Sequence, residues 1–295
     1  MTLRQAQAGA DPTVQTSWFG VPRKPRPKAG RRLIWLREFA IRWGALLALG
    51  VLWEVVALLV KSPFFPPITK VLARFVQLWF SGPPSSLFLT EKFGTDLAPS
   101  LFRLFGGWGL GIVLGIILGV AIGRNRIFGD FVEPIIHFAR AIPPPALLPV
   151  FFILIGIGDD MKISLIAFAV LWPVLLNTID GVRSVESLQL DTARVFEFSR
   201  AKVFFGIVLP SAAPKIFAGL RVSLAVALIV MVISEMTSSS GIGYNVVIAQ
   251  RSFRMLDMWA GIVVLGIIGY VLNALLALVE SRVTRWHRGS REGVS

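Results

Sequence analysis

Two ionisable residues in the apolar C-terminal half of the chain are the first candidates for a chemical role. Arg221 and Glu235 flank the apolar run 222–234. A helix of that length spans only about 20 Å, which is less than the hydrocarbon layer of a bilayer. At least one charge is therefore expected at membrane depth or shielded by neighbouring helices, where ionisable groups often serve transport. Candidates for lining a path for a polar solute are these two residues and three hydroxyl side chains that follow them, Thr237, Ser238 and Ser239.

The motifs of common catalytic and metal sites are absent from the sequence. The chain has no Cys and only two His, His137 and His287, which lie far apart, so neither a disulfide nor a thiolate or paired-His metal site is expected. No Lys follows a Gly, which excludes the phosphate-binding loop of nucleotide-driven pumps. Neither a Ser-His-Asp nor an HExxH arrangement is present. We therefore expect this chain to have no enzyme activity, metal or cofactor.

The composition places the ionisable residues in a membrane protein. The chain is 55% hydrophobic and 16% charged, with a mean hydropathy of +0.71, whereas soluble domains carry about 25% charged residues. Segments of about 20 apolar residues can cross a bilayer as helices. Six segments are long enough, or nearly so, namely 43–60, 99–123, 131–156, 161–181, 212–236 and 258–280. We predict an all-α integral membrane protein with six transmembrane helices.

The basic residues orient these helices. Lys and Arg lie beside the apolar runs and form no aromatic-interleaved patch, so nucleic acid is not an expected partner despite the net charge of +13. Because Lys and Arg concentrate on the cytoplasmic side of membrane proteins, the basic N-terminus, the 183–210 loop and the C-terminus are predicted to be cytoplasmic. The predicted parts are a basic, disordered arm (1–42), a transmembrane domain containing the loop (43–286) and a cytoplasmic tail (287–295).

A glycine ladder indicates close helix packing. Glycines recur at every fourth position of the second segment, at Gly107, Gly111, Gly115, Gly119 and Gly123. This spacing places all five on one helix face, where another backbone can approach closely. The partner is either a helix of the same bundle or a second subunit, and both remain open here.

A proline run and three basic residues also lie within the predicted spans or at their ends. The run 141–145 (AIPPP) cannot be regular helix, because proline removes a backbone donor and clashes with the preceding turn. It therefore belongs either at a helix end or beside a pathway. Arg103, Arg140 and Lys215 are expected to extend their charged ends to the membrane interface.

The segment DTARVFEFSRAKVFFGIVLP (191–210) is a polar interlude between apolar runs. It resembles the cytoplasmic EAA loop of permease subunits of bacterial ABC importers. Asp191, Thr192 and Ala193 stand where that family usually has Glu-Ala-Ala, and Leu209-Pro210 stands where the motif closes with Leu-Pro. The blocks 139–166, 172–187, 210–225 and 233–244 are similar to consecutive blocks of the nitrate/sulfonate/taurine/bicarbonate permease branch.

The resemblance implies a fold and a set of partners. The fold would be that of type I ABC importer permeases, which is also called MetI-like. The partners would be two ATP-binding subunits, a second permease copy and an extracytoplasmic solute-binding protein, with membrane lipid around the helices. The chain would form the channel for a small solute, for which a small organic or inorganic anion is the leading expectation. A self-contained channel or secondary carrier is the competing class.

The resemblance also assigns a role to the 183–210 loop. In the family, a short helix of this loop docks into a groove of the ATP-binding subunit. Val195, Phe196 and Phe198 would supply the apolar contacts, although an amphipathic loop lying on its own bundle or on lipid headgroups is the alternative. Glu197 stands where the family has a turn-forming glycine. A glutamate resists a left-handed backbone, so we expect either that the helix continues through Glu197 or that the loop geometry is shifted.

Overall fold

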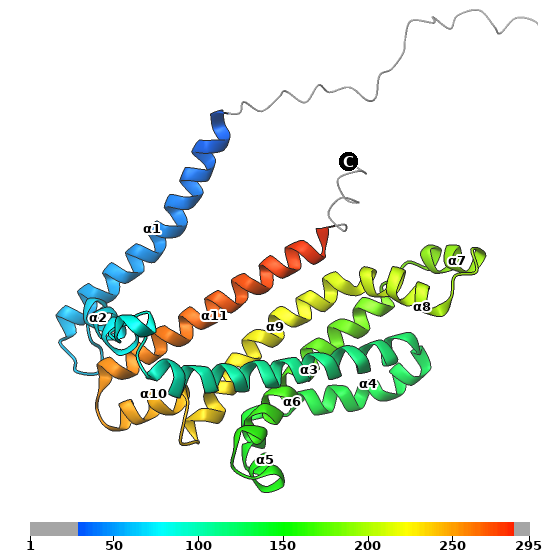
Figure 1. Ribbon diagram of the computed structural model, residues 1–295. Helices are drawn as coiled ribbons and strands as arrows, with labels where there is room; N and C mark the ends of the chain where they lie inside the picture. The colour runs from blue at the N-terminus through cyan, green and yellow to red at the C-terminus, as the bar shows by residue number, and fades with distance from the viewer. Residues whose placement is uncertain (1–28, 286–295) are drawn as a thin grey trace, which may run out of the picture. The chain divides into compact units, whose positions relative to one another are not determined.

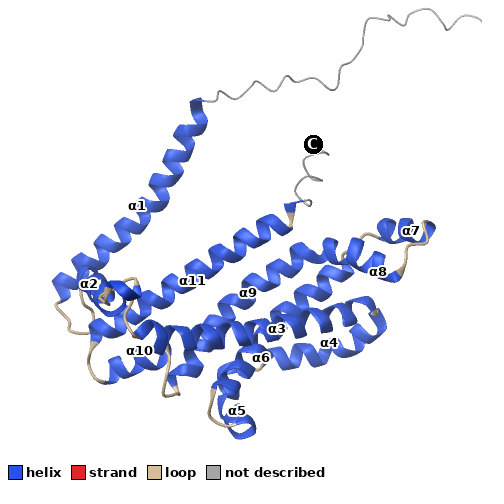
Figure 2. Cartoon of the chain, viewed as in Figure 1, coloured by secondary structure: helices blue, strands red, loops and turns tan. Residues whose placement is uncertain are grey.

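The computed structural model describes residues 29–285, and all secondary structure in that range is helical (Figure 2). The α-helices are α1 (Ala29–Val60), α2 (Ile68–Trp79), α3 (Ala98–Arg124), α4 (Arg126–Ala141), α5 (Leu148–Ile155), α6 (Asp159–Arg183), α7 (Ser187–Val195), α8 (Arg200–Val203), α9 (Leu209–Met236), α10 (Ile242–Arg251) and α11 (Met255–Val283). Short 3-10 turns, η1 (Pro84–Ser86) and η3 (Pro144–Leu147), and π-helical turns, η2 (Phe93–Leu97) and η4 (Phe204–Val208), complete the order. The predicted all-α class is confirmed.

The chain divides between Trp53 and Glu54 into two units. The first unit contains most of α1, which begins at Ala29. The part of the predicted disordered arm from residue 29 to 42 is therefore helical, which corrects the expectation for that part. Residues 1–28 and the tail 287–295 lie outside the described residues. All helix contacts below are within the second unit.

Five helical stretches in the described range are long and apolar enough to cross a membrane, namely Trp43–Val60, Phe93–Arg124, Asp159–Arg183, Arg200–Met236 and Met255–Val283. The predicted span 131–156 is not one helix. It is broken into α4 and the segment Pro144–Ile155, with an 82° bend between them. The physical reason is the proline run, because three successive residues without a backbone N–H cannot continue the ladder of α4. The prolines thus lie at a helix end.

The glycine ladder packs α3 against α6, and the two helices lie side by side (Figure 1). A Cβ atom at Gly107 would lie 2.5 Å from Cβ of Ile166, and one at Gly115 would lie 2.8 Å from Cβ of Val174. The residues of α6 that face the five glycines are Ile166, Val170, Val174, Thr178 and Val182. Both sets recur every fourth residue and in the same order, so α3 and α6 run parallel. This face is therefore filled from within the chain.

The parallel course of α3 and α6 fixes the path of the bent segment between them. The chain leaves α3 at Arg124 and enters α6 at Asp159, which contacts Arg103 near the opposite end of α3. The α4–α5 segment therefore leads the chain back from one end of this pair to the other, and the bent pair of helices brings the candidate spans to six if it is counted as one.

The core lies where α9 joins this pair. α9 runs antiparallel to α6, because Gly181 meets Ala212 near the start of α9 and Gly219 meets Asn177 one helical turn earlier in α6. The buried core between these helices includes Leu104, Leu165 and Met231. The bundle therefore has two ends. The basic end is where α3 and α6 finish, at Arg124 and Arg183, and the Asp159 end is where α6 begins and α9 finishes.

Candidate functional site

The 183–210 loop forms a helical hairpin at the basic end. α7 is followed by a tight turn, and α8 then continues through η4 into α9. The backbone N–H of Glu197 donates to the carbonyl of Arg194 at 3.0 Å, and that of Phe198 donates to the carbonyl of Ala193 at 3.0 Å. This pair of bonds is the Schellman motif that commonly ends helices at a left-handed residue.

Glu197 is that left-handed residue, with φ of 50°. The first alternative drawn from the sequence was wrong, because α7 ends at Val195 and does not continue through Glu197. The second alternative, a shifted loop geometry, stays a prediction. The glutamate accepts the left-handed backbone, which costs roughly 1–2 kcal/mol for a residue with a Cβ atom. The sequence identified the position at which the turn of the loop and the backbone preference of glutamate compete. It could not show which of the two effects is stronger.

The turn presents large apolar side chains to the surroundings. Val195 is 80% exposed and Phe196 67% exposed, whereas Phe198 is 38% exposed and Ala193 is buried. The rings of Phe196 and Phe198 lie 6.1 Å apart. These residues fall between the candidate spans Asp159–Arg183 and Arg200–Met236. Their exposure is therefore not explained by the apolar length of a spanning helix.

An open hollow of about 680 Å³ lies between α7 and the start of α9. Phe196, Phe198, Ile207 and Pro210 contribute apolar walls, and Thr192 is among the polar lining residues. Leu209 and Pro210 begin α9 directly after the π-helical turn η4. The hydroxyl of Thr192 donates to the carbonyl of Leu188 within α7 at 2.7 Å.

The charges around the turn are arranged in local contacts. Arg194 pairs with Asp191 at 2.9 Å. The ammonium of Lys202 lies 3.8 Å from the centre of the Phe198 ring, within the range of a cation–π interaction. The loop therefore combines exposed aromatic rings with a basic rim, a composition that is typical of protein interfaces.

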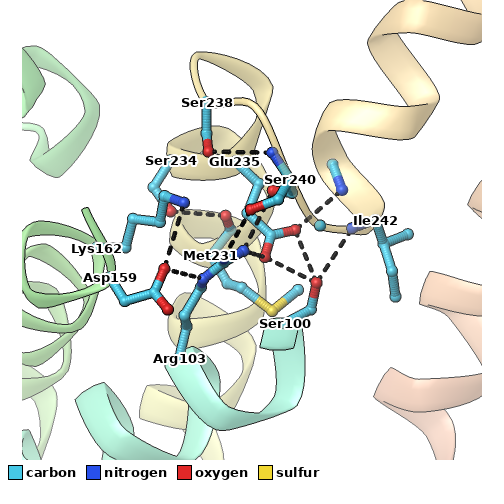
Figure 3. Close-up of polar contacts among 12 residues, drawn as sticks. Ser100, Arg103, Asp159, Lys162, Met231, Ser234, Glu235, Ser238, Ser240 and Ile242 are labelled. Atoms are coloured by element: carbon cyan, nitrogen blue, oxygen red, sulfur yellow. Dashed lines mark hydrogen bonds and ion pairs between the residues drawn. The ribbon is translucent and has the colours of Figure 1, made fainter. Parts of the chain in front are cut away.

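A second polar site lies at the Asp159 end, where Arg103 is the central residue (Figure 3). We call it the Arg103 cluster, and its members are Ser100, Arg103, Asp159, Lys162, Glu235 and Ser240. Arg103 donates to Asp159 at 2.7 Å and to Glu235 at 2.7 Å. It also donates to the carbonyl of Ser240 at 3.2 Å and to its hydroxyl at 2.8 Å. The expectation that Arg103 reaches the interface was wrong, because it is only 3% exposed.

Glu235 is fully buried in this cluster. Its carboxylate accepts from the hydroxyl of Ser100 at 2.7 Å and from the backbone N–H of Gly243 at 3.0 Å, in the first turn of α10. Gly241 has φ of 106°, and a Cβ atom there would lie 2.3 Å from the carboxyl carbon of Glu235. The carboxylate thus ties α9, α3 and the start of α10 together. In this structure it is paired inside the protein.

The other path candidates are distributed along α9 and after it. Arg221 lies nearer the basic end and pairs with Glu280 of α11, so the structure does not bring it together with Glu235. Thr237 and Ser239 are exposed in the loop that follows α9, and Ser238 is partly exposed. Their role in a path stays a prediction.

Sequence reasoning missed most members of the Arg103 cluster. Ser100, Asp159, Lys162 and Ser240 were not singled out there. One signal was present: Arg103 is four residues before Gly107 and so continues the glycine ladder. A charge on that face is expected to meet the helix that packs on the ladder, and the structure shows that this helix is α6, with Asp159 at its start as the partner of Arg103.

The chain matches known transport proteins over most of its length. The model of the family described as "binding-protein-dependent transport system inner membrane component" matches residues 111–285. The taurine transport system permease TauC of Escherichia coli is 34% identical, and the match covers 87% of this chain and 94% of TauC. The putative aliphatic sulfonates transport permease SsuC of Bacillus subtilis is 31% identical, with 91% and 94% covered.

The chain belongs to the binding-protein-dependent permease family. It is a multi-pass inner membrane component and not the catalytic subunit of its transporter. An inward-facing structure of the MetNI methionine ABC transporter shares the fold, with a TM-score of 0.55 and 17% identity over 64% of this chain and 93% of that one. The predicted family and the predicted MetI-like fold are confirmed. Membership also implies an ATPase and a binding protein as partners.

Proposed function

We propose that two copies of this chain form the membrane channel of an ATP-driven importer, with the 183–210 loop as the docking site for each ATP-binding subunit. The observation that carries this proposal is the exposure of Phe196, 67%, on a hydrogen-bonded turn outside the candidate spans. A group of exposed apolar side chains at one turn, here Val195, Phe196 and Phe198, favours a protein partner. The aromatic hollow beside it offers further apolar surface to that partner.

The proposal includes an orientation. The basic end of the bundle carries Arg124, Arg183, Arg194 and Lys202, and it would face the cytoplasm because such residues favour that side. Both termini would be cytoplasmic, and the Asp159 end would face the extracytoplasmic binding protein.

For the solute we propose a small anion of the sulfonate, taurine or nitrate type. The similarity to TauC and SsuC supports this class. Among the path candidates, Arg221 supports it chemically, because its side chain is cationic, 52% exposed and within a candidate span. Its contact with Glu280 would have to exchange for contact with a passing anion. Thr237 and Ser239 would add hydroxyl groups at the outer end of the path.

Reconstitution tests the function directly. The permease is placed in proteoliposomes with its ATP-binding subunit and binding protein. The solute is chosen by a thermal-shift screen of the binding protein against taurine, alkanesulfonates, nitrate and bicarbonate. We expect uptake only when ATP reaches the ATP-binding subunit. Uptake of the same solute without that subunit would identify a self-contained channel or secondary carrier.

A further inference from the structure

The left-handed glutamate of the 183–210 loop is unfavourable within the isolated chain for two reasons. Glu197 has φ of 50°, a conformation that side chains with a Cβ atom rarely adopt. It also places a carboxylate directly after the C-terminus of α7, where the helix dipole disfavours negative charge. Strained residues of this kind persist when the surrounding structure over-determines them, and they cluster at functional sites.

No compensating contact within the described range, residues 29–285, joins the carboxylate of Glu197 to a cation. The nearby Arg194 pairs with Asp191 at 2.9 Å. Lys202 lies over the ring of Phe198 at 3.8 Å. The side chain of Glu197 is exposed beside Phe196, the proposed apolar anchor.

We propose that Glu197 is a recognition residue for the ATP-binding subunit, in which its carboxylate forms an ion pair with a lysine or arginine of the docking groove. This inference rests on the proposed function of the 183–210 loop. The Schellman turn fixes the backbone from which the carboxylate projects, because two hydrogen bonds hold Glu197 and Phe198. The exposed acid lies in the sequence between the basic residues Arg194 and Arg200, so a partner surface that places a cation opposite Glu197 would complement it. Charge patterns of this kind select one partner and disfavour others by repulsion.

A glycine at this position would remove the backbone strain together with the carboxylate. The two possible roles of Glu197 therefore give opposite results for Glu197→Gly. A glutamate that is merely tolerated binds no partner, so its replacement by glycine leaves docking unchanged or improves it. A glutamate that recognises the partner loses its ion pair, so docking weakens although the turn becomes less strained.

The test measures binding of the purified ATP-binding subunit to the full-length permease in nanodiscs, at several KCl concentrations. We expect Glu197→Gln to weaken binding about tenfold, which corresponds to roughly 1.4 kcal/mol, and to flatten its salt dependence. Glu197→Gly is expected to weaken binding to a similar extent, and Glu197→Lys to weaken it further. The matched control is Glu91→Gln, which neutralises an exposed carboxylate outside the loop and is expected to bind like the wild type.

Two outcomes distinguish a failure of the recognition role of Glu197 from a failure of the docking role of the 183–210 loop. If Phe196→Ala weakens binding while Glu197→Gly and Glu197→Gln bind like the wild type or tighter, the recognition role is refuted and the docking loop stands. If Phe196→Ala and all Glu197 variants bind like the wild type, the docking role of the loop fails and this inference fails with it. Weaker binding of both Glu197→Gly and Glu197→Gln, with the control unchanged, would establish the ion pair as a determinant of docking.

Discussion

Removal of Arg103 from its cluster should be among the most destabilising single changes in the bundle. Its side chain is 4% exposed and that of its partner Glu235 is 0% exposed. Arg103→Met would remove four hydrogen bonds to Asp159, Glu235 and Ser240. Breaking a buried ion pair by removal of one partner typically costs about 3–5 kcal/mol, because the other charge stays buried and uncompensated. We expect a loss of this size in the free energy of unfolding.

The charge balance of the cluster also predicts how two substitutions combine. Arg103 and Lys162 are matched by Asp159 and Glu235, so the four charges sum to zero. Arg103→Met leaves a net negative charge, and Glu235→Gln leaves a net positive one. The double variant restores neutrality with Lys162 and Asp159. We therefore expect the double variant to cost less than the sum of the single variants, with a coupling free energy of about 1–3 kcal/mol.

A second Arg–Glu pair provides the control. Arg221 pairs with Glu280, but their side chains are 52% and 24% exposed. Arg221→Met removes this one ion pair, whereas Arg103→Met removes four hydrogen bonds, so we expect Arg221→Met to cost less. The assay is reversible unfolding in mixed detergent micelles with increasing dodecyl sulfate, followed by tryptophan fluorescence. The cluster does not stabilise the Asp159 end if Arg103→Met lowers the free energy of unfolding no more than Arg221→Met does. The same conclusion follows if the losses caused by Arg103→Met and Glu235→Gln simply add in the double variant.

Two further predictions concern orientation and helix packing. The chain has no native Cys, so a cysteine introduced at exposed Ser187 should react with an impermeant thiol reagent only in opened cells. A cysteine at exposed Ser81 should react in intact spheroplasts. The reverse pattern would contradict the proposed topology. Gly115→Leu should sharply lower the yield of folded permease, because even a Cβ atom there would lie 2.8 Å from Cβ of Val174. Gly109→Leu is the control on the same helix, since no atom lies within 4 Å of the corresponding position, and equal yields of the two variants would contradict the packing argument.

The helices and their packing face followed from the sequence because both depend on local pattern. Apolar runs of about 20 residues predict spans, and the fourfold spacing from Gly107 to Gly123 predicts one close helix face. The choice of α6 as the partner depends on the tertiary fold and could not be read from that spacing. The broken span was partly predictable, since the prolines at 143–145 excluded regular helix there. The size of the bend, 82°, could not be predicted from the prolines alone.

The candidate sites were less predictable because they depend on contacts between distant residues. Arg103 and Glu235 are 132 positions apart, and only the tertiary fold buries them together. Glu235 was selected for transport because of its charge at membrane depth, yet its carboxylate is paired inside the protein. For Glu197, local propensity disfavoured the left-handed turn, and the hydrogen bonds of the loop outweighed that propensity. In each case the competing free-energy terms come from neighbours that the local sequence does not identify.

The central claim, that the 183–210 loop couples this permease to an ATPase, is tested most directly by Phe196→Ala. Phe196 is 67% exposed on the loop, and Phe253, which is 74% exposed and follows α10, is a matched aromatic residue outside the loop. The measurement is ATP-dependent uptake into proteoliposomes, with the amount of ATP-binding subunit retained by the tagged permease determined in the same preparation. We predict that Phe196→Ala inserts normally but loses most of the bound subunit and most of the uptake, since truncating a buried interface anchor costs about 2 kcal/mol or more. Phe253→Ala should retain the subunit. Full retention and full uptake by Phe196→Ala would contradict the claim.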